Sequence, residues 1–106
     1  MRLHRNKYGA KKVELDGIRF DSKREAARYV DLKLMERAGH IARLTVHPVL
    51  PLAVNGVKIG KYTPDFRYEE GPEIHFEDVK GVMTRDAALR IKLAEAIYGI
   101  TVEIVR

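Results

Sequence analysis

Cysteine is absent from this sequence of 106 residues, which excludes disulfide-stapled folds and thiolate metal sites. An intracellular setting is then the default. No apolar run approaches the ~20 residues that span a bilayer, and the N-terminus lacks the apolar segment of a signal peptide. We therefore expect a soluble protein that is not exported. Its length and its 45% hydrophobic and 33% charged residues fit one globular domain.

Acidic residues are absent from the first twelve positions, which hold five basic side chains. The remainder, residues 13–106, holds 15 basic and 15 acidic side chains, so the whole formal excess of +5 lies in the leading segment. Such a segment suits a polyanion such as DNA, although a solubilising disordered tail explains it equally well. We expect residues 1–12 to form a flexible basic arm and residues 13–106 to form the domain.

The first half of the domain carries clear signals for a hairpin and a helix. Alternating residues around Asp16-Gly17 predict a hairpin over residues 13–20. Ser22 lies three residues before Glu25, a capping-box pattern that predicts a helix over residues 22–38. Its expected apolar face consists of Ala26, Ala27, Val30, Leu34 and Ala38.

The second half alternates strands with one more helix. Two prolines in residues 41–54 require an edge or broken strand, and Asn55-Gly56 marks a second hairpin. Strands are expected over residues 61–68 and 73–80, then a helix that begins after Thr84 and a last strand over residues 100–105. This order predicts an α/β domain, with a central mixed sheet flanked by two helices.

Charged side chains stand at the end of the strand before the second helix. Asp78 and Lys80 share one face of that strand, whereas Glu77 points to the other. A carboxylate and an ammonium beside core positions are costly unless they serve each other or a ligand. The preceding strand brings Asp65 towards Asp78, and two converging carboxylates favour a divalent cation such as Mg²⁺. Lys80 could then orient a metal-bound water or stabilise charge on a phosphate.

These residues carry a family resemblance. Pro64-Asp65, followed after 12 residues by Asp78-Val79-Lys80, resembles the P-D…(D/E)-x-K signature of the PD-(D/E)XK nuclease superfamily. The segments VELDGIRFDSKRE, YTPDF, EDVKG and IYG resemble more specifically small phage-type endonucleases of that superfamily, including Holliday-junction-resolvase-like enzymes. The resemblance covers residues 13–105 and implies a restriction-endonuclease-like core of helix, three strands, helix and strand.

The resemblance also implies an activity and a site. The protein would hydrolyse DNA phosphodiester bonds with Mg²⁺, or alternatively Mn²⁺, as its cofactor. Asp65, Asp78 and the Val79 carbonyl would bind the metal, Lys80 would be the catalytic lysine, and Glu25 would complete the site. The setting would be a phage or prophage protein in a bacterial cytoplasm. The residues expected to contact DNA are Arg2, Arg5, Lys7, Lys11 and Lys12 of the arm, together with Lys92 of the second helix.

Two of these assignments have alternatives. The capping box with Ser22 accounts for Glu25 without any catalytic role. Glu77 would replace Asp78 as a ligand if a bulge reversed the strand locally. The four histidines lack the spacing of metal ligands, so we expect them in the sheet or on the surface: His4, His40, His47 and His75.

The function itself also has alternatives. The endonuclease could be nonspecific or nicking, or it could act on branched DNA, in which case two coordinated cuts require a symmetric homodimer. A non-catalytic DNA-binding module that retains the nuclease fold predicts salt-dependent binding that ignores Mg²⁺. A protein-interaction domain with an incidental acidic cluster predicts no effect of divalent metal.

Overall fold

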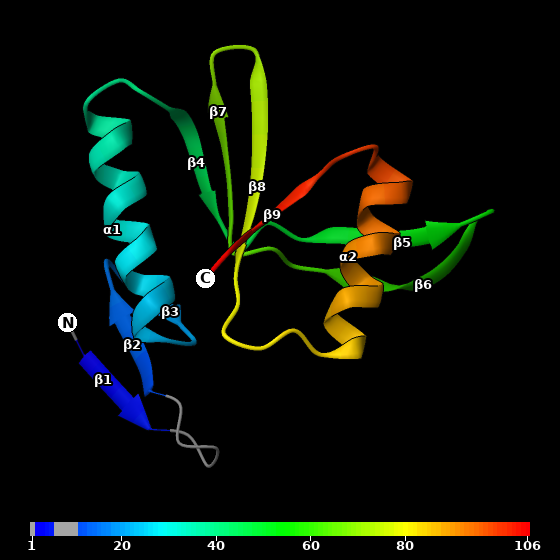
Figure 1. The fold of residues 1–106 in the computed structure, drawn as a ribbon, viewed down its shortest axis with the longest axis horizontal. Helices are drawn as coiled ribbons and strands as arrows, with labels where there is room; N and C mark the ends of the chain where they lie inside the picture. The colour runs from blue at the N-terminus through cyan, green and yellow to red at the C-terminus, as the bar shows by residue number, and fades with distance from the viewer. Residues whose placement is uncertain (1, 6–10) are drawn as a thin grey trace.

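A four-stranded mixed sheet with a helix on each side organises the fold in the computed structural model, which describes residues 2–5 and 11–106 (Figure 1). The elements follow in the order β1 (Arg2–Arg5), β2 (Lys11–Leu15), β3 (Ile18–Phe20), α1 (Lys23–Arg37), β4 (Ala42–Val46), β5 (Leu50–Val54), β6 (Val57–Tyr62), β7 (Phe66–Glu70), β8 (Glu73–Val79), α2 (Arg85–Tyr98) and β9 (Val102–Val105).

The central sheet has the strand order β4-β7-β8-β9. β7 is antiparallel to both β4 and β8, whereas β8 and β9 are parallel. Because β7 runs opposite to its neighbours, its beginning lies at the same end of the sheet as the ends of β4 and β8. The tight turn between β7 and β8 lies at the other end (Figure 1).

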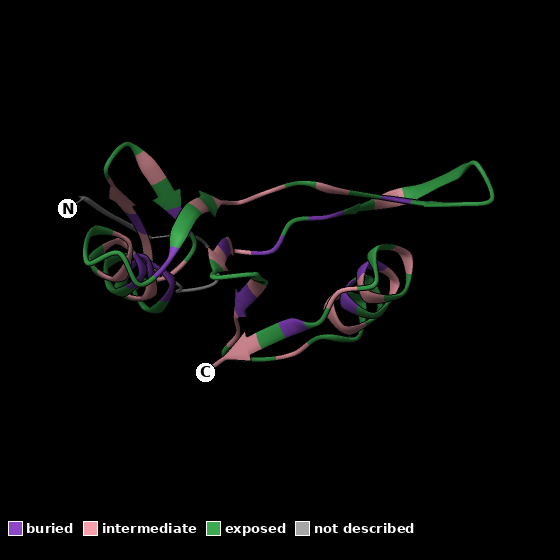
Figure 2. Ribbon diagram, turned by 90° about the horizontal axis from the view of Figure 1, so that it is seen from above, coloured by how far each residue is buried: buried purple, intermediate pink, exposed green. Residues whose placement is uncertain are grey.

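Two hydrophobic clusters hold the layers together, as the buried segments in Figure 2 indicate. One joins α1 and the β2–β3 hairpin to the sheet, and it includes the fully buried rings of Phe20 and Phe66. The other joins α2 and the β5–β6 hairpin to the sheet around Leu52, Ile91 and Ala94. The expected α/β domain with a flanked central sheet is confirmed.

The turn and capping signals act as the sequence predicts, whereas the strand expected over residues 61–68 is divided between the end of β6 and the start of β7. Asp16 and Gly17 both have positive φ, as do Asn55 and Gly56, which matches the turn type that closes tight hairpins. Ser22 caps α1 by accepting the Glu25 N–H at 3.1 Å. The helix over residues 23–37 therefore agrees with the predicted one, and α2 begins after Thr84 as expected.

The expected apolar face of α1 is wrong. Val30 and Leu34 are 40% and 57% exposed, and the buried face contains Glu25, Tyr29 and Leu32 beside Ala26. The Tyr29 hydroxyl donates to Asp16 at 2.9 Å, so its polar tip is satisfied while its ring is buried. The sequence prediction missed this face because it counted apolar residues only. Glu25 and Tyr29 carry polar groups, and these groups are hydrogen-bonded in the fold.

The N-terminal segment differs from the arm that the sequence suggested. Arg2–Arg5 forms a strand paired antiparallel with β2, and Lys11 and Lys12 belong to β2 itself. Lys7 lies outside the described residues, as do the side chains of Arg2, Arg5 and Lys11, so their expected DNA contacts stay predictions. Neither helix in the described part of the chain is long and apolar enough to cross a membrane.

Candidate metal centre

Asp65 occupies the point where three strands of the central sheet meet. It directly precedes β7, and its carbonyl accepts the His47 N–H at 2.9 Å, just beyond the end of β4. Its own N–H donates to the Glu77 carbonyl of β8 at 3.0 Å. Backbone hydrogen bonds on both sides therefore fix Asp65 at the sheet end where β4 and β8 finish.

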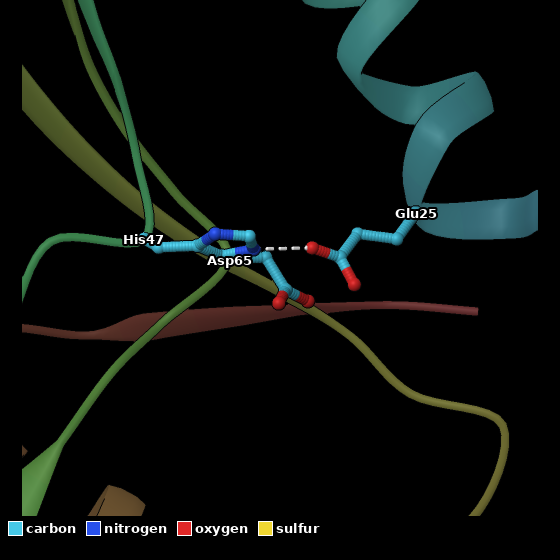
Figure 3. A group of neighbouring side chains, drawn as sticks. All are labelled: Glu25, His47 and Asp65. Carbon is cyan, nitrogen blue, oxygen red and sulfur yellow. Dashed lines mark hydrogen bonds and ion pairs between the residues drawn. The ribbon is translucent and has the colours of Figure 1, made fainter. Parts of the chain in front are cut away.

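Three potential ligand side chains converge on this point from different elements. Glu25, His47 and Asp65 each offer a ligand atom within 4.8 Å of the others (Figure 3). His47 Nε2 lies 2.6 Å from Glu25 Oε1, while the other carboxylate oxygen of Glu25 accepts the Asp21 N–H at 3.2 Å. Glu25 thus serves the helix end with one oxygen and faces the site with the other.

Asp78 and Lys80 complete the cluster from β8 and the residues after it. Asp78 is 3% exposed, and its Oδ2 accepts the Tyr62 hydroxyl at 2.6 Å. Lys80 Nζ lies 3.7 Å from the same oxygen. The structure therefore brings Asp65, Asp78 and Lys80 together, as strand alternation predicts, although their roles stay predictions.

The carboxyl groups of Glu25, Asp65 and Asp78 lie close together, and few positive groups of the described residues lie near them to offset their charge. Burial first, and then the nearby charge of Glu25, raise the pKa of Asp65 to about 8. The Val79 N–H opposes this shift by donating to Asp65 Oδ2 at 2.7 Å, whereas Asp78 adds to it through a hydrogen bond and its charge. Without a cation, burial and the neighbouring carboxylates therefore favour the protonated form of Asp65.

Glu77 faces the opposite side of β8 and has an entirely different environment. Arg28 of α1 donates to its two carboxylate oxygens at 2.8 and 2.7 Å, and the Tyr68 hydroxyl donates to one of them. Burial alone would raise the pKa of Glu77, yet these hydrogen bonds hold it below its usual value. The β7–β8 register is continuous, so no bulge turns Glu77 towards Asp65.

His47 is the site residue that sequence reasoning missed, because the histidines lack ligand spacing along the chain. It has a φ of 54° and directly precedes Pro48. Such left-handed backbone is costly in a residue other than glycine, and these conformations gather at functional sites. A His-Pro pair at the point where a strand breaks was the available signal.

A hollow of about 280 Å³ adjoins Asp78 and Lys80 on the α2 side of the sheet. Lys92 does not line it and is exposed, unlike the site-facing basic residue expected on that helix. Arg90 takes this place, with its guanidinium donating to the Lys61 carbonyl at 2.6 Å and to Asp86 at 3.0 Å. Arg90 and Lys92 are two residues apart on α2, so their side chains point to different sides of the helix.

Comparison with curated proteins found no match, and comparison with solved structures found none either. A family described only as a protein of unknown function matches nearly the whole chain. The match runs over residues 5–104, so the chain belongs to that family, DUF1064.

Proposed function

We propose that this protein is a metal-dependent endonuclease that hydrolyses phosphodiester bonds in DNA. The observation that carries the proposal is the meeting of Glu25, Asp65 and Asp78 at one end of the sheet. Lys80 stands beside them, 3.7 Å from Asp78. The resemblance to PD-(D/E)XK nucleases rests on these same residues, so sequence pattern and side-chain placement support one function.

The donor set fits a divalent cation. The ligand atoms of Glu25, His47 and Asp65 lie within 4.8 Å of one another. Burial first, and then the charge of Glu25, raise the pKa of Asp65, and a bound cation would favour its ionised form. Asp65 and Asp78 would hold the cation, with Glu25 and His47 in reach. Carboxylates suit Mg²⁺, and the imidazole makes Mn²⁺ a strong alternative. The Val79 carbonyl is proposed as a ligand from the resemblance alone.

Such a cation, when bound, would activate a water and neutralise charge on the phosphate. The Lys80 ammonium would stabilise the negative charge that builds on the scissile phosphate, since it lies 3.7 Å from Asp78, one of the carboxylates that would hold the cation. Arg90 and Lys61 border the adjoining hollow and would contact neighbouring DNA phosphates. Asp78 is kept in place by Tyr62, whose hydroxyl donates to it.

The proposal is tested by incubating the protein with supercoiled plasmid and with a synthetic four-way junction, in Mg²⁺, Mn²⁺ or EDTA. We expect metal-dependent cutting that falls by about 10²-fold or more in Asp78→Asn and in Lys80→Ala. Asp31→Asn removes an exposed carboxylate of α1 and serves as the matched control, with unchanged activity. Metal-independent binding without cutting in every condition would instead indicate a DNA-binding module.

Two further measurements refine the proposal. If a homodimer cuts the junction at two symmetric positions, the substrate of the enzyme is branched DNA. If a monomer nicks the plasmid, the enzyme is a nonspecific nuclease. Glu25→Gln keeps an oxygen for the Asp21 N–H but removes the charge. Lost activity with an unchanged melting temperature would therefore place Glu25 in the metal site. A phage or prophage origin and a bacterial cytoplasmic setting follow from the resemblance and belong to the same proposal.

A further inference from the structure

Three carboxylates and one imidazole lie close together on the central sheet, those of Glu70, Glu73, Glu103 and His75. Glu70 and Glu73 flank the turn between β7 and β8, at the end of the sheet away from Asp65 (Figure 1). His75 of β8 pairs across the strands with Tyr68, and their rings stack with centroids 5.1 Å apart. Glu70 and Glu73 face each other across the same hairpin. Like charges directly opposite each other destabilise a strand pair, so this arrangement calls for a positive charge, which a protonated His75 or a bound cation would supply.

The fourth member, Glu103 of β9, sets the orientation of the imidazole. His75 Nδ1 lies 2.7 Å from Glu103 Oε1, and because a carboxylate can only accept, Nδ1 carries the proton. In the neutral ring Nε2 then has a free lone pair. A carboxylate that fixes the tautomer in this way is the usual outer partner of a histidine that binds metal.

The Nε2 atom is buried, in a side chain that is 17% exposed, and it makes no hydrogen bond among the described residues, only ion-pair contacts. It points between two carboxylates, at 3.1 Å from Glu70 Oε1 and 3.4 Å from Glu73 Oε2. In the neutral ring, a lone pair that faces two negative groups without an intervening hydrogen is unfavourable. A cation between the three atoms would satisfy all of them.

The two separations from Nε2 match those of ligands around one small cation, and all three ligand atoms lie within 4.8 Å of one another. Two ligands at about 2.1 Å from a metal stand about 3.4 Å apart in a tetrahedral arrangement and about 3.0 Å apart in an octahedral one. The observed separations of 3.1 and 3.4 Å fall in this range. One imidazole nitrogen with carboxylate oxygens is a donor set that suits Zn²⁺ better than Mg²⁺.

We propose that Glu70, Glu73 and His75 form a second metal site, which binds Zn²⁺ and in which Glu103 positions the imidazole. The carboxylates of Glu70 and Glu73 are 55% and 71% exposed, so the metal has access from solvent. Bound Zn²⁺ would join the β7–β8 turn to β9 through the His75–Glu103 pair. This proposal is independent of the nuclease activity and stands whether or not DNA is cut.

The test follows the histidine side chains by long-range ¹H–¹⁵N NMR during titration with ZnCl₂ at pH 7.5. The neutral ring of His75 should carry its proton on Nδ1 before Zn²⁺ is added. Zn²⁺ should then shift the Nε2 resonance of His75 in a saturable, stoichiometric way and leave exposed His40 unchanged. Because the readout is specific to each residue, binding of Zn²⁺ at His47 in the candidate metal centre does not confuse it.

Three variants sharpen the test. Glu73→Gln, at an exposed position, and Glu103→Gln should each weaken Zn²⁺ binding at His75 by about 10- to 100-fold, whereas the control Asp31→Asn should not. Thermal unfolding shows that each variant is folded. A proton on Nε2 of the neutral ring, an unshifted His75 in saturating Zn²⁺, or equal binding in the variants and wild type would overturn the proposal. In those cases a protonated His75 would itself be the cation of the cluster.

Discussion

Asp65→Asn should make the metal-free protein more stable, although it removes a residue of the candidate metal centre. The folded state raises the pKa of Asp65 from 3.8 to about 8, mainly by burial and by the charge of Glu25. The unfolded chain releases that proton near pH 4, whereas the folded protein keeps it until about pH 8. The stability of the metal-free wild type should therefore fall as the pH rises between these values.

The size of the effect follows from the shift. Each unit of pKa corresponds to about 1.4 kcal/mol, so a shift of about four units sets a ceiling of order 5 kcal/mol at pH 8. Asp65 is only partly buried, and solvent screens part of this cost. We expect Asp65→Asn to gain about 2 kcal/mol at pH 8, or roughly 10 °C in melting temperature for a domain of this size. Asparagine can still accept the Val79 N–H, and its amide can donate to Asp78.

The assay is thermal unfolding followed by circular dichroism, in EDTA at pH 5 and pH 8. The advantage of Asp65→Asn should be large at pH 8 and smaller at pH 5. Addition of Mg²⁺ or Mn²⁺ at pH 8 should stabilise wild type and leave the variant unchanged, because only wild type can bind the cation through Asp65. A variant that is less stable than wild type, or an advantage that does not depend on pH, would refute this account of the site.

Three more predictions concern stability and can be checked by urea unfolding. Arg28→Ala should cost about 3–5 kcal/mol, because it leaves the buried carboxylate of Glu77 without its cation, and a loss below 1 kcal/mol would contradict the buried pair. Ser22→Ala should lower the free energy of unfolding by about 1 kcal/mol because it removes the cap of α1. An unfolding midpoint equal to that of wild type would contradict this role of Ser22. Leu32→Ala should cost about 2–5 kcal/mol, since Leu32 is fully buried, and the same change at exposed Leu34 is its matched control.

Turns, caps and strand alternation could be predicted from the sequence because their causes are local. Asn55-Gly56 closes a hairpin through its own backbone preferences, and Thr84 caps α2 by accepting the Ala87 N–H three residues away. The convergence of Asp65 with Asp78 was also accessible, because a tight turn between two strands fixes which residues meet. These inferences needed no knowledge of distant parts of the chain.

The rest depended on tertiary partners that no local pattern specifies. The buried face of α1 packs in one cluster with Val13 and Phe20 of the hairpin, and Asp16 accepts the Tyr29 hydroxyl from another element. His47 enters the site because its left-handed backbone turns the chain at the end of β4, which its spacing from other ligands could not indicate. Arg90 rather than Lys92 borders the site because the rotation of α2 is fixed by Ile91 and Ala94 in the core.

The strongest support for a binding site at this end of the sheet comes from comparing two adjacent carboxylates of β8. Glu77 and Asp78 are equally buried, at 1% and 3% exposed. The chain supplies Glu77 with a bidentate guanidinium and a hydroxyl, which hold its pKa low. Asp78 has one hydroxyl and an ammonium 3.7 Å away, and it shares its surroundings with Asp65 and Glu25. The fold neutralises one buried acid fully and leaves its neighbours short of positive charge, which supports the proposal that a cation from outside the chain binds there.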